Sequence, residues 1–279
     1  MNTMQALANR VDRFIAKAQG DNPDLDAVRE DDDFTTFKQD FATAILAQAV
    51  WTAKQLDNLS EEYIARDLGS MSNEQKLGLL AYLRNNMPPM SELMDKATLN
   101  SWFTKVFESG AVSVYRANNL PVEFKLTNSN YISQIAANTD FLLEQSSLDE
   151  TTRKALVNLI ASDRADGLTR EEIASDIQDQ FDTISATRAE MIADTETNGM
   201  LNRGQFAAMK ESGVQMKAWL ALGPNPCEIT CLSNSGDDYI PMDSMFGSGD
   251  LMPPGHPRCE CSLDYMNLDI SPADVWEGE

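Results

Sequence analysis

Cys227-Glu-Ile-Thr-Cys231 and His256-Pro-Arg-Cys259-Glu-Cys261 hold all four cysteines and the only histidine of this chain of 279 residues. Thiolate sulfur and neutral imidazole are the ligands that zinc takes in closed, four-coordinate structural sites, commonly as two close pairs separated by a loop. Everything upstream of this segment has the pattern of a helical scaffold. The two runs therefore predict a small C-terminal module that is closed by a metal ion.

We expect a Zn²⁺ ion at this place, bound by the four cysteines, with the histidine as the substitute if one cysteine points away. The five candidate ligands are Cys227, Cys231, Cys259, Cys261 and His256. Two disulfides or four buried, reduced thiols are the alternatives, because the C-x3-C and C-x-C spacings are not those of a regular zinc finger. Clustered Cys and His without a secretion signal favour a metal over disulfides.

Helix and strand signals lead into the cysteine segment from residue 147 onward. Ser147 and Thr169 each stand three residues before a glutamate, which is the capping-box pattern of a helix start. Two further helices are expected over residues 188–201 and 202–213. Residues 215–220 then alternate Met, Ala and Leu with Gln, Lys and Trp. This alternation predicts a strand that runs into the cysteine segment.

The first 120 residues have the pattern of a group of packed helices. One helix is strongly periodic, because apolar residues recur at steps of three and four over several turns. These residues are Phe34, Phe37, Phe41, Ile45, Ala49, Ala53 and Leu56. Pro88 and Pro89 must interrupt the helices around them, since each removes a backbone donor. Further helices are expected over residues 3–18, 61–68, 72–85 and 91–107.

The resulting fold class is mainly α with a small α+β C-terminal module and a helical N-terminal half. Residues 110–121 are expected to be a linker or a short extended piece. We therefore predict a helical N-terminal region over 1–120, a second domain over 121–265 and an acidic tail over 266–279.

The net charge of −22 bears on possible partners. Such a field repels phosphate backbones, so direct binding of nucleic acid by the whole surface is not expected. The three aspartates at 31–33 are interpreted as solvated charge at the N-terminal end of the next helix, not as a cation site. No run of 18 apolar residues occurs, so no membrane partner is expected.

Four motifs in order resemble the phage Mu F-like family of head morphogenesis proteins. That family has a glycine-hydroxyl-x-x-E-I-A helix, an I-A-R-T-E helix, an aromatic strand, a cysteine pair and a terminal P-x-H-P-x-C-R-C. The matching stretches here are 122–128, 167–174, 188–196 and 256–261, with Trp219 and the first cysteine pair between the last two. The resemblance covers residues 122–263, about half of the chain.

The resemblance implies a minor capsid protein, present in several copies per virion and bound near the portal. It also implies a role in head assembly or genome delivery, with the portal protein and other capsid proteins as partners. The expected location is the portal vertex of the virion head, which is assembled in the host cytoplasm. Asp194 and Glu260 depart from the family, because each stands where arginine is usual. Any contact that those arginines make in relatives is therefore in doubt here.

An enzyme and a toxin carrier of the same family are the alternatives. A hydrolase with a histidine base would have to use His256, and the sequence offers no set of nucleophile, base and orienting group around it. Only 18 residues follow Cys261, with five acidic residues and no lysine or arginine, so they form a tail and not an effector domain. We therefore predict a protein without catalytic residues.

Overall fold

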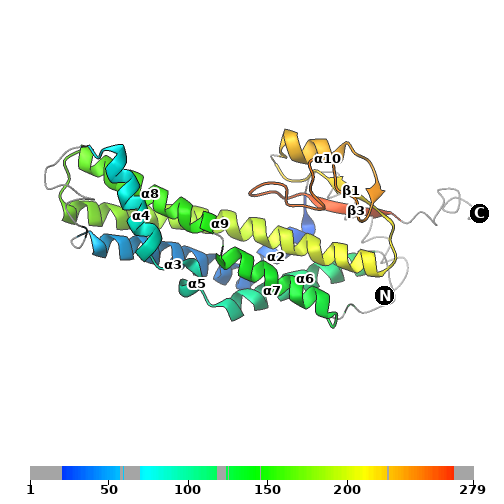
Figure 1. Ribbon diagram of the computed structural model, residues 1–279. Coiled ribbons are helices and arrows are strands. Elements are labelled where there is room, and N and C mark those ends of the chain that lie inside the picture. The colour runs from blue at the N-terminus through cyan, green and yellow to red at the C-terminus, as the bar shows by residue number, and fades with distance from the viewer. Residues whose placement is uncertain are drawn as a thin grey trace, which may run out of the picture. The chain divides into compact units, whose positions relative to one another are not determined.

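The computed structural model describes residues 21–56, 59, 70–117, 124, 126–144, 146–224 and 226–266 (Figure 1). The protein is mainly helical with a small antiparallel sheet near the C-terminus, which confirms the predicted fold class. The helices are α2 (Pro23–Arg29), α3 (Asp32–Gln55), α4 (Asn73–Asn86), α5 (Met90–Leu93), α6 (Lys96–Ala117), α7 (Ser129–Glu144), α8 (Ser146–Ala165), α9 (Arg170–Glu211) and α10 (Ser233–Ser235), with one π-helical turn, η1 (Glu228–Leu232).

The sheet has the strand order β2-β1-β3, and both pairings are antiparallel. Its strands are β1 (Met216–Leu220), β2 (Ile240–Pro241) and β3 (Ser262–Met266). Figure 1 shows β1 and β3 side by side, next to α10. The strand predicted over 215–220 is thus confirmed. Its buried side chains are Lys217 and Trp219, whereas Met216, Ala218 and Leu220 on its other face are only partly buried.

The chain packs as two compact units. Among the described residues, the sheet unit comprises those up to 35, those from 100 to 135 and those from 191 onward, and the helical unit comprises those from 36 to 99 and from 136 to 190. Each unit therefore combines stretches that are far apart in the sequence. The predicted domain boundaries follow neither unit and stay a prediction, because compactness does not define the extent of a family domain.

The helical unit is built on the apolar stripe of α3. The predicted stripe residues from Phe37 to Leu56 are all buried, which confirms the periodicity. Gln48 is also buried on α3, and its amide donates hydrogen bonds to the Pro88 carbonyl at 2.9 Å and to Asp149 Oδ1 at 2.6 Å. Pro88 lies between α4 and α5, so the predicted interruption is confirmed.

The sheet unit depends on a close contact between α6 and α9. A Cβ atom on Gly204 would lie 1.9 Å from the Phe107 carbonyl oxygen, and one on Gly110 would lie 2.2 Å from the Leu201 carbonyl oxygen. Only glycine allows the two backbones to approach so closely. The predicted linker from residue 110 is therefore wrong, because α6 continues to Ala117 and packing outweighs the low helix propensity of glycine.

Helix α9 replaces three predicted helices by one of 42 residues. Its start is confirmed, since the Thr169 amide donates to Glu172 Oε2 at 2.8 Å and the Glu172 amide donates to Thr169 Oγ1 at 3.3 Å. Gly213, with a φ of +78°, follows its end as expected. The predicted breaks near residues 188 and 202 are wrong, because no glycine or proline at these places is a strong enough stop signal to end the helix.

Other predicted helices differ in detail or cannot be compared. The helix predicted over 91–107 is divided into α5 and α6, because Asp95 Oδ2 accepts the Thr98 amide at 3.0 Å and caps a new start. The helices predicted over 3–18 and 61–68, and the tail after residue 266, lie outside the described residues. No helix of the described part is long and apolar enough to cross a membrane.

Candidate metal centre

Three of the five predicted ligands meet beneath the small sheet. Cys231 lies in η1, whereas His256 and Cys259 lie in the loop that leads into β3. Cys231 and Cys259 are buried in one hydrophobic cluster with Trp219 and Phe246. The site is therefore formed where the two cysteine segments pack against the sheet.

The ligand atoms of these three residues lie within 4.8 Å of one another. Cys231 Sγ is 3.0 Å from His256 Nε2 and 3.9 Å from Cys259 Sγ. Tetrahedral zinc with ordinary bond lengths places two sulfurs about 3.8 Å apart and a sulfur and a nitrogen about 3.6 Å apart. The two sulfurs already have this spacing, and a small shift of the imidazole would bring Nε2 to the required distance from Cys231 Sγ. Cys231, His256 and Cys259 could therefore hold a metal ion.

The orientation of the imidazole supports metal binding. His256 Nδ1 is 2.8 Å from the carbonyl oxygen of Pro257. A carbonyl oxygen only accepts hydrogen bonds, so Nδ1 carries the proton and the lone pair of Nε2 faces Cys231. An N–H bond from the second ring nitrogen to a carbonyl is the usual device that orients a metal-binding histidine.

Cys261 and Cys227 lie at the edge of this group. The Cys261 thiol hydrogen-bonds to Cys259, which raises the pKa of Cys261 and lowers the pKa of Cys259. The backbone amides of Thr230 and Ile229 hydrogen-bond to the Cys227 sulfur and lower its pKa. Cys261 thus contacts the group and Cys227 interacts electrostatically with Cys259, so both are candidates for a fourth ligand, although neither belongs to the close group of three.

All four cysteines are free thiols. The distance of 3.9 Å between the sulfurs of Cys231 and Cys259 is far longer than the roughly 2.05 Å of a disulfide bond. The structure thus contains neither of the two disulfides that were the alternative to a metal. His256, expected only as a substitute ligand, belongs to the central group.

Two asparagines of α9 hold the C-x-C segment, and the sequence interpretation did not identify them. Asn198 Nδ2 donates to the carbonyl oxygens of Cys259 at 2.7 Å and Cys261 at 3.0 Å. Asn202 Nδ2 donates to the Cys261 carbonyl at 3.2 Å. Both asparagines are fully buried. Their spacing of four places both amides on one face of α9, and this was the signal that could have revealed them.

The loop that carries His256 also needs a glycine. A Cβ atom on Gly255 would lie 2.4 Å from Cγ2 of Thr230 in η1. A larger residue at position 255 would force either the Thr230 side chain or the loop that carries His256 to shift. Gly255 thus allows the two cysteine segments to come together.

Arg29 of α2 binds both positions at which this chain departs from the family resemblance. Its Nε is 3.0 Å from Asp194 Oδ1, and its Nη2 is 2.9 Å from Glu260 Oε1. Burial alone would lower the pKa of Arg29, but the two carboxylates outweigh it and raise this pKa. Asn22 adds a hydrogen bond of 2.8 Å to the Glu260 carbonyl. The two acidic residues therefore attach α2 to the cysteine segment.

A buried lysine lies beside the same core. Lys217 Nζ donates to the Leu251 carbonyl at 2.6 Å and lies 5.1 Å from the ring centre of Phe206 and 5.2 Å from that of Phe246. Burial lowers the pKa of Lys217 to about 8. The aromatic rings and the carbonyl stabilise its charge, so this lysine can point inward from β1.

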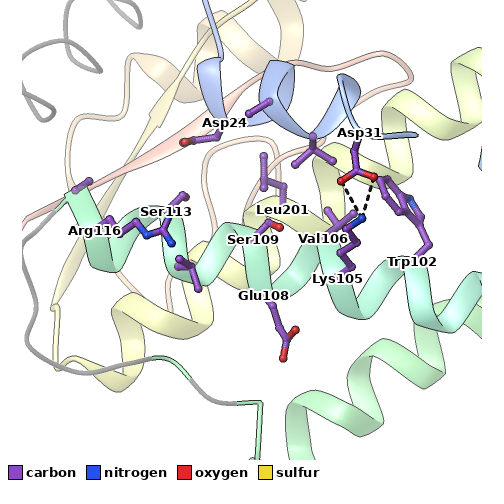
Figure 2. Close-up of a pocket in the computed structure, with 14 residues that line it drawn as sticks. Asp24, Asp31, Trp102, Lys105, Val106, Glu108, Ser109, Ser113, Arg116 and Leu201 are labelled. Atoms are coloured by element: carbon purple, nitrogen blue, oxygen red, sulfur yellow. Dashed lines mark hydrogen bonds and ion pairs between the residues drawn. The ribbon is translucent and has the colours of Figure 1, made fainter. Parts of the chain in front are cut away.

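A cavity of about 730 Å³ in the sheet unit is lined by α2, α6 and Leu201 (Figure 2). Lys105 points toward Asp31 there, with 2.8 Å between Nζ and Oδ1, and also binds Asp33 at 2.5 Å. The aspartates at 31–33 lie at the start of α3, as expected. Two of the three are thus paired with Lys105 and are not simply solvated.

Comparison of the chain with family models, curated proteins and solved structures found no match to any of them.

Proposed function

We propose that this protein is a non-enzymatic minor capsid protein of a tailed phage, bound near the portal and acting in head assembly or genome delivery. The observation that carries the proposal is the order of four motifs that resemble the Mu F-like family. Two of these stretches, 188–196 and 256–261, contact each other through the Arg258 amide and Thr195 Oγ1, 2.9 Å apart. The two motif stretches therefore pack against each other at this point.

The metal of this module is Zn²⁺ in our proposal, bound by Cys231, Cys259 and His256, with Cys261 or Cys227 as the fourth ligand. A mixed set of thiolates and one imidazole is the donor set that suits zinc. Cys231 and Cys259 are buried and His256 is only partly exposed, which suits a structural zinc site enclosed by protein groups. Its role is to cross-link η1 to the loop before β3, because the three short strands offer little cohesion by themselves.

Catalysis by the same residues is disfavoured by burial. The contact between Cys231 and His256 is short enough for a nucleophile and its base. However, Cys231 has no exposed surface, and burial followed by the neighbouring Cys259 raises its pKa. A reactive cysteine needs an accessible sulfur and a lowered pKa. The geometry therefore favours a structural site over a hydrolase.

The zinc proposal is tested by elemental analysis of protein purified without added metal or chelator, together with thiol titration. One zinc per chain is expected, and the variant His256→Ala should lose most of it. If the protein contains no zinc and four free thiols, the cysteine cluster is a buried group of reduced thiols. If it contains no zinc and fewer than four free thiols, the cysteines form disulfides.

The capsid proposal needs a separate experiment. Co-purification with the portal protein of the same phage is expected, and deletion of the gene should give defective heads or particles that fail to deliver DNA. Normal infectious particles from the deletion mutant would refute the proposal. Hydrolytic turnover that disappears in His256→Ala would establish the enzyme alternative instead.

A further inference from the structure

A second group of titratable side chains lies in the helical unit, in a cleft of about 750 Å³ lined by α8, the turn after it and α9. Five of the lining residues are acidic: Asp163, Asp166, Glu172, Asp176 and Asp179. The lining, as far as the structure describes it, contains no lysine or arginine. The cleft therefore concentrates negative charge in a protein whose net charge is already −22.

Asp163 is the unusual member of this group. Its side chain is buried, with only 6% of the residue exposed, and its Oδ2 atom has no hydrogen-bond partner. A buried carboxylate oxygen without a partner is costly, by several kcal/mol for a full charge. An acid that was merely part of a solvated surface would not be held in this position.

The second carboxylate in contact makes the arrangement more specific. Asp163 hydrogen-bonds to Asp176, and burial followed by this neighbour raises the pKa of Asp163 to about 6. Ionised carboxylates are acceptors only, so two of them attract each other only through a shared proton or a cation. The pair lies on two helices, α8 and α9, which a bound cation would join.

We propose that the acidic cleft binds one hydrated divalent cation of the Mg²⁺ class, with Asp163 and Asp176 as direct ligands. Mg²⁺ commonly binds proteins through one or two carboxylates while it keeps several waters. The cleft has room for those waters, and Asp166, Glu172 and Asp179 can accept their hydrogen bonds. This site is independent of the cysteine and histidine group, which offers sulfur and nitrogen to a softer metal.

The test uses Mn²⁺ as a paramagnetic substitute for Mg²⁺. Mn²⁺ is titrated into the whole chain, and electron paramagnetic resonance follows the loss of the signal of free Mn²⁺. The buffer contains about 0.15 M salt, so that diffuse binding to the acidic surface is screened. We expect one Mn²⁺ per chain, displaced by excess Mg²⁺. Asp163→Asn should weaken binding at least about tenfold, equivalent to about 1.4 kcal/mol.

Asp182→Asn is the matched control, because Asp182 is an exposed acid on α9 that does not line the cleft. It removes the same charge from the same helix and should leave the affinity unchanged. If Asp163→Asn loses its native circular dichroism, Asp176→Asn replaces it, since Asp176 is only partly buried. Equal affinity in all variants, or no bound Mn²⁺ up to about 1 mM, would overturn the proposal and leave a shared proton as the account of the pair.

Discussion

The side-chain amide of Asn198 lies 2.7 Å from the carbonyl oxygen of Cys259 and so ties a candidate metal ligand to α9, the longest helix among the described residues. The bond is buried, and Asn198 makes a second one to the Cys261 carbonyl. The C-x-C segment therefore has its backbone positioned by α9 before any metal binds.

Replacing Asn198 by alanine should destabilise the protein by about 2–3 kcal/mol, because it leaves a buried carbonyl without its donor. Zinc retention should fall as well, since Cys259 loses its positioning contact. Urea unfolding and metal content of the purified variant measure the two effects. Asn86→Ala is a control, because Asn86 is exposed and bonds only locally to Tyr82. A variant with full stability and full zinc would show that Asn198 does not position the segment.

Removal of the metal should loosen the C-terminal module and leave the helices mostly intact. The ligands must be deprotonated to bind, so zinc affinity should also fall as the pH is lowered. Near-ultraviolet circular dichroism reports the packing of Trp219, which is buried beside Cys261, and far-ultraviolet dichroism reports the helices. Loss of both signals together on chelation would contradict this expectation.

Substitution of Gly204 by alanine should be strongly destabilising, by about 3 kcal/mol or more, because the new methyl group would collide with the Phe107 carbonyl. The helix propensity of alanine by itself would act in the opposite direction. Thermal or urea unfolding gives the sign directly. Ser109→Ala, at an exposed position of α6, should stay within about 0.5 kcal/mol of the parent protein.

Arg29→Ala should cost about 1–3 kcal/mol, because it leaves the half-buried Asp194 and Glu260 without their cation. Much of this cost should disappear when Asp194→Asn and Glu260→Gln are added, since the variant then buries no unpaired charge. The free energies of unfolding of the parent, Arg29→Ala and the triple variant are compared at one pH. If the triple variant is no more stable than Arg29→Ala, the two ion pairs are not the reason for the loss.

In the absence of divalent cations, the free energy of unfolding should fall as the pH rises from about 4 to about 6, because Asp163 ionises over this range. Its pKa is raised in the folded state, to about 6, so the protonated form is favoured there and stability is lost once it ionises. The acids that face it are Asp166, Glu172, Asp176 and Asp179. At pH 7, Asp163→Asn should be about 1–2 kcal/mol more stable than the parent, and near pH 4 the two should be equal. A difference that does not change with pH would refute this assignment.

The sequence alone was sufficient for the features that are local. The stripe of α3, the proline break after α4 and the capping box before α9 are each specified by residues within one or two helical turns, and all are confirmed. The grouping of every cysteine and the histidine in one segment likewise indicated a candidate metal site, and three of the five named residues, Cys231, His256 and Cys259, form a group that could hold a metal ion.

Only the tertiary structure decided the features that depend on distant residues. Gly110 breaks a helix when judged by propensity, but it continues one here because Leu201 packs directly on its backbone. His256 enters the central ligand group because Gly255 lets its loop reach η1. Asp194 and Glu260 are explained by Arg29, which is 165 residues from Asp194 in the chain. Such contacts leave no local periodicity, because close packing and charge pairing act through space and not along the sequence.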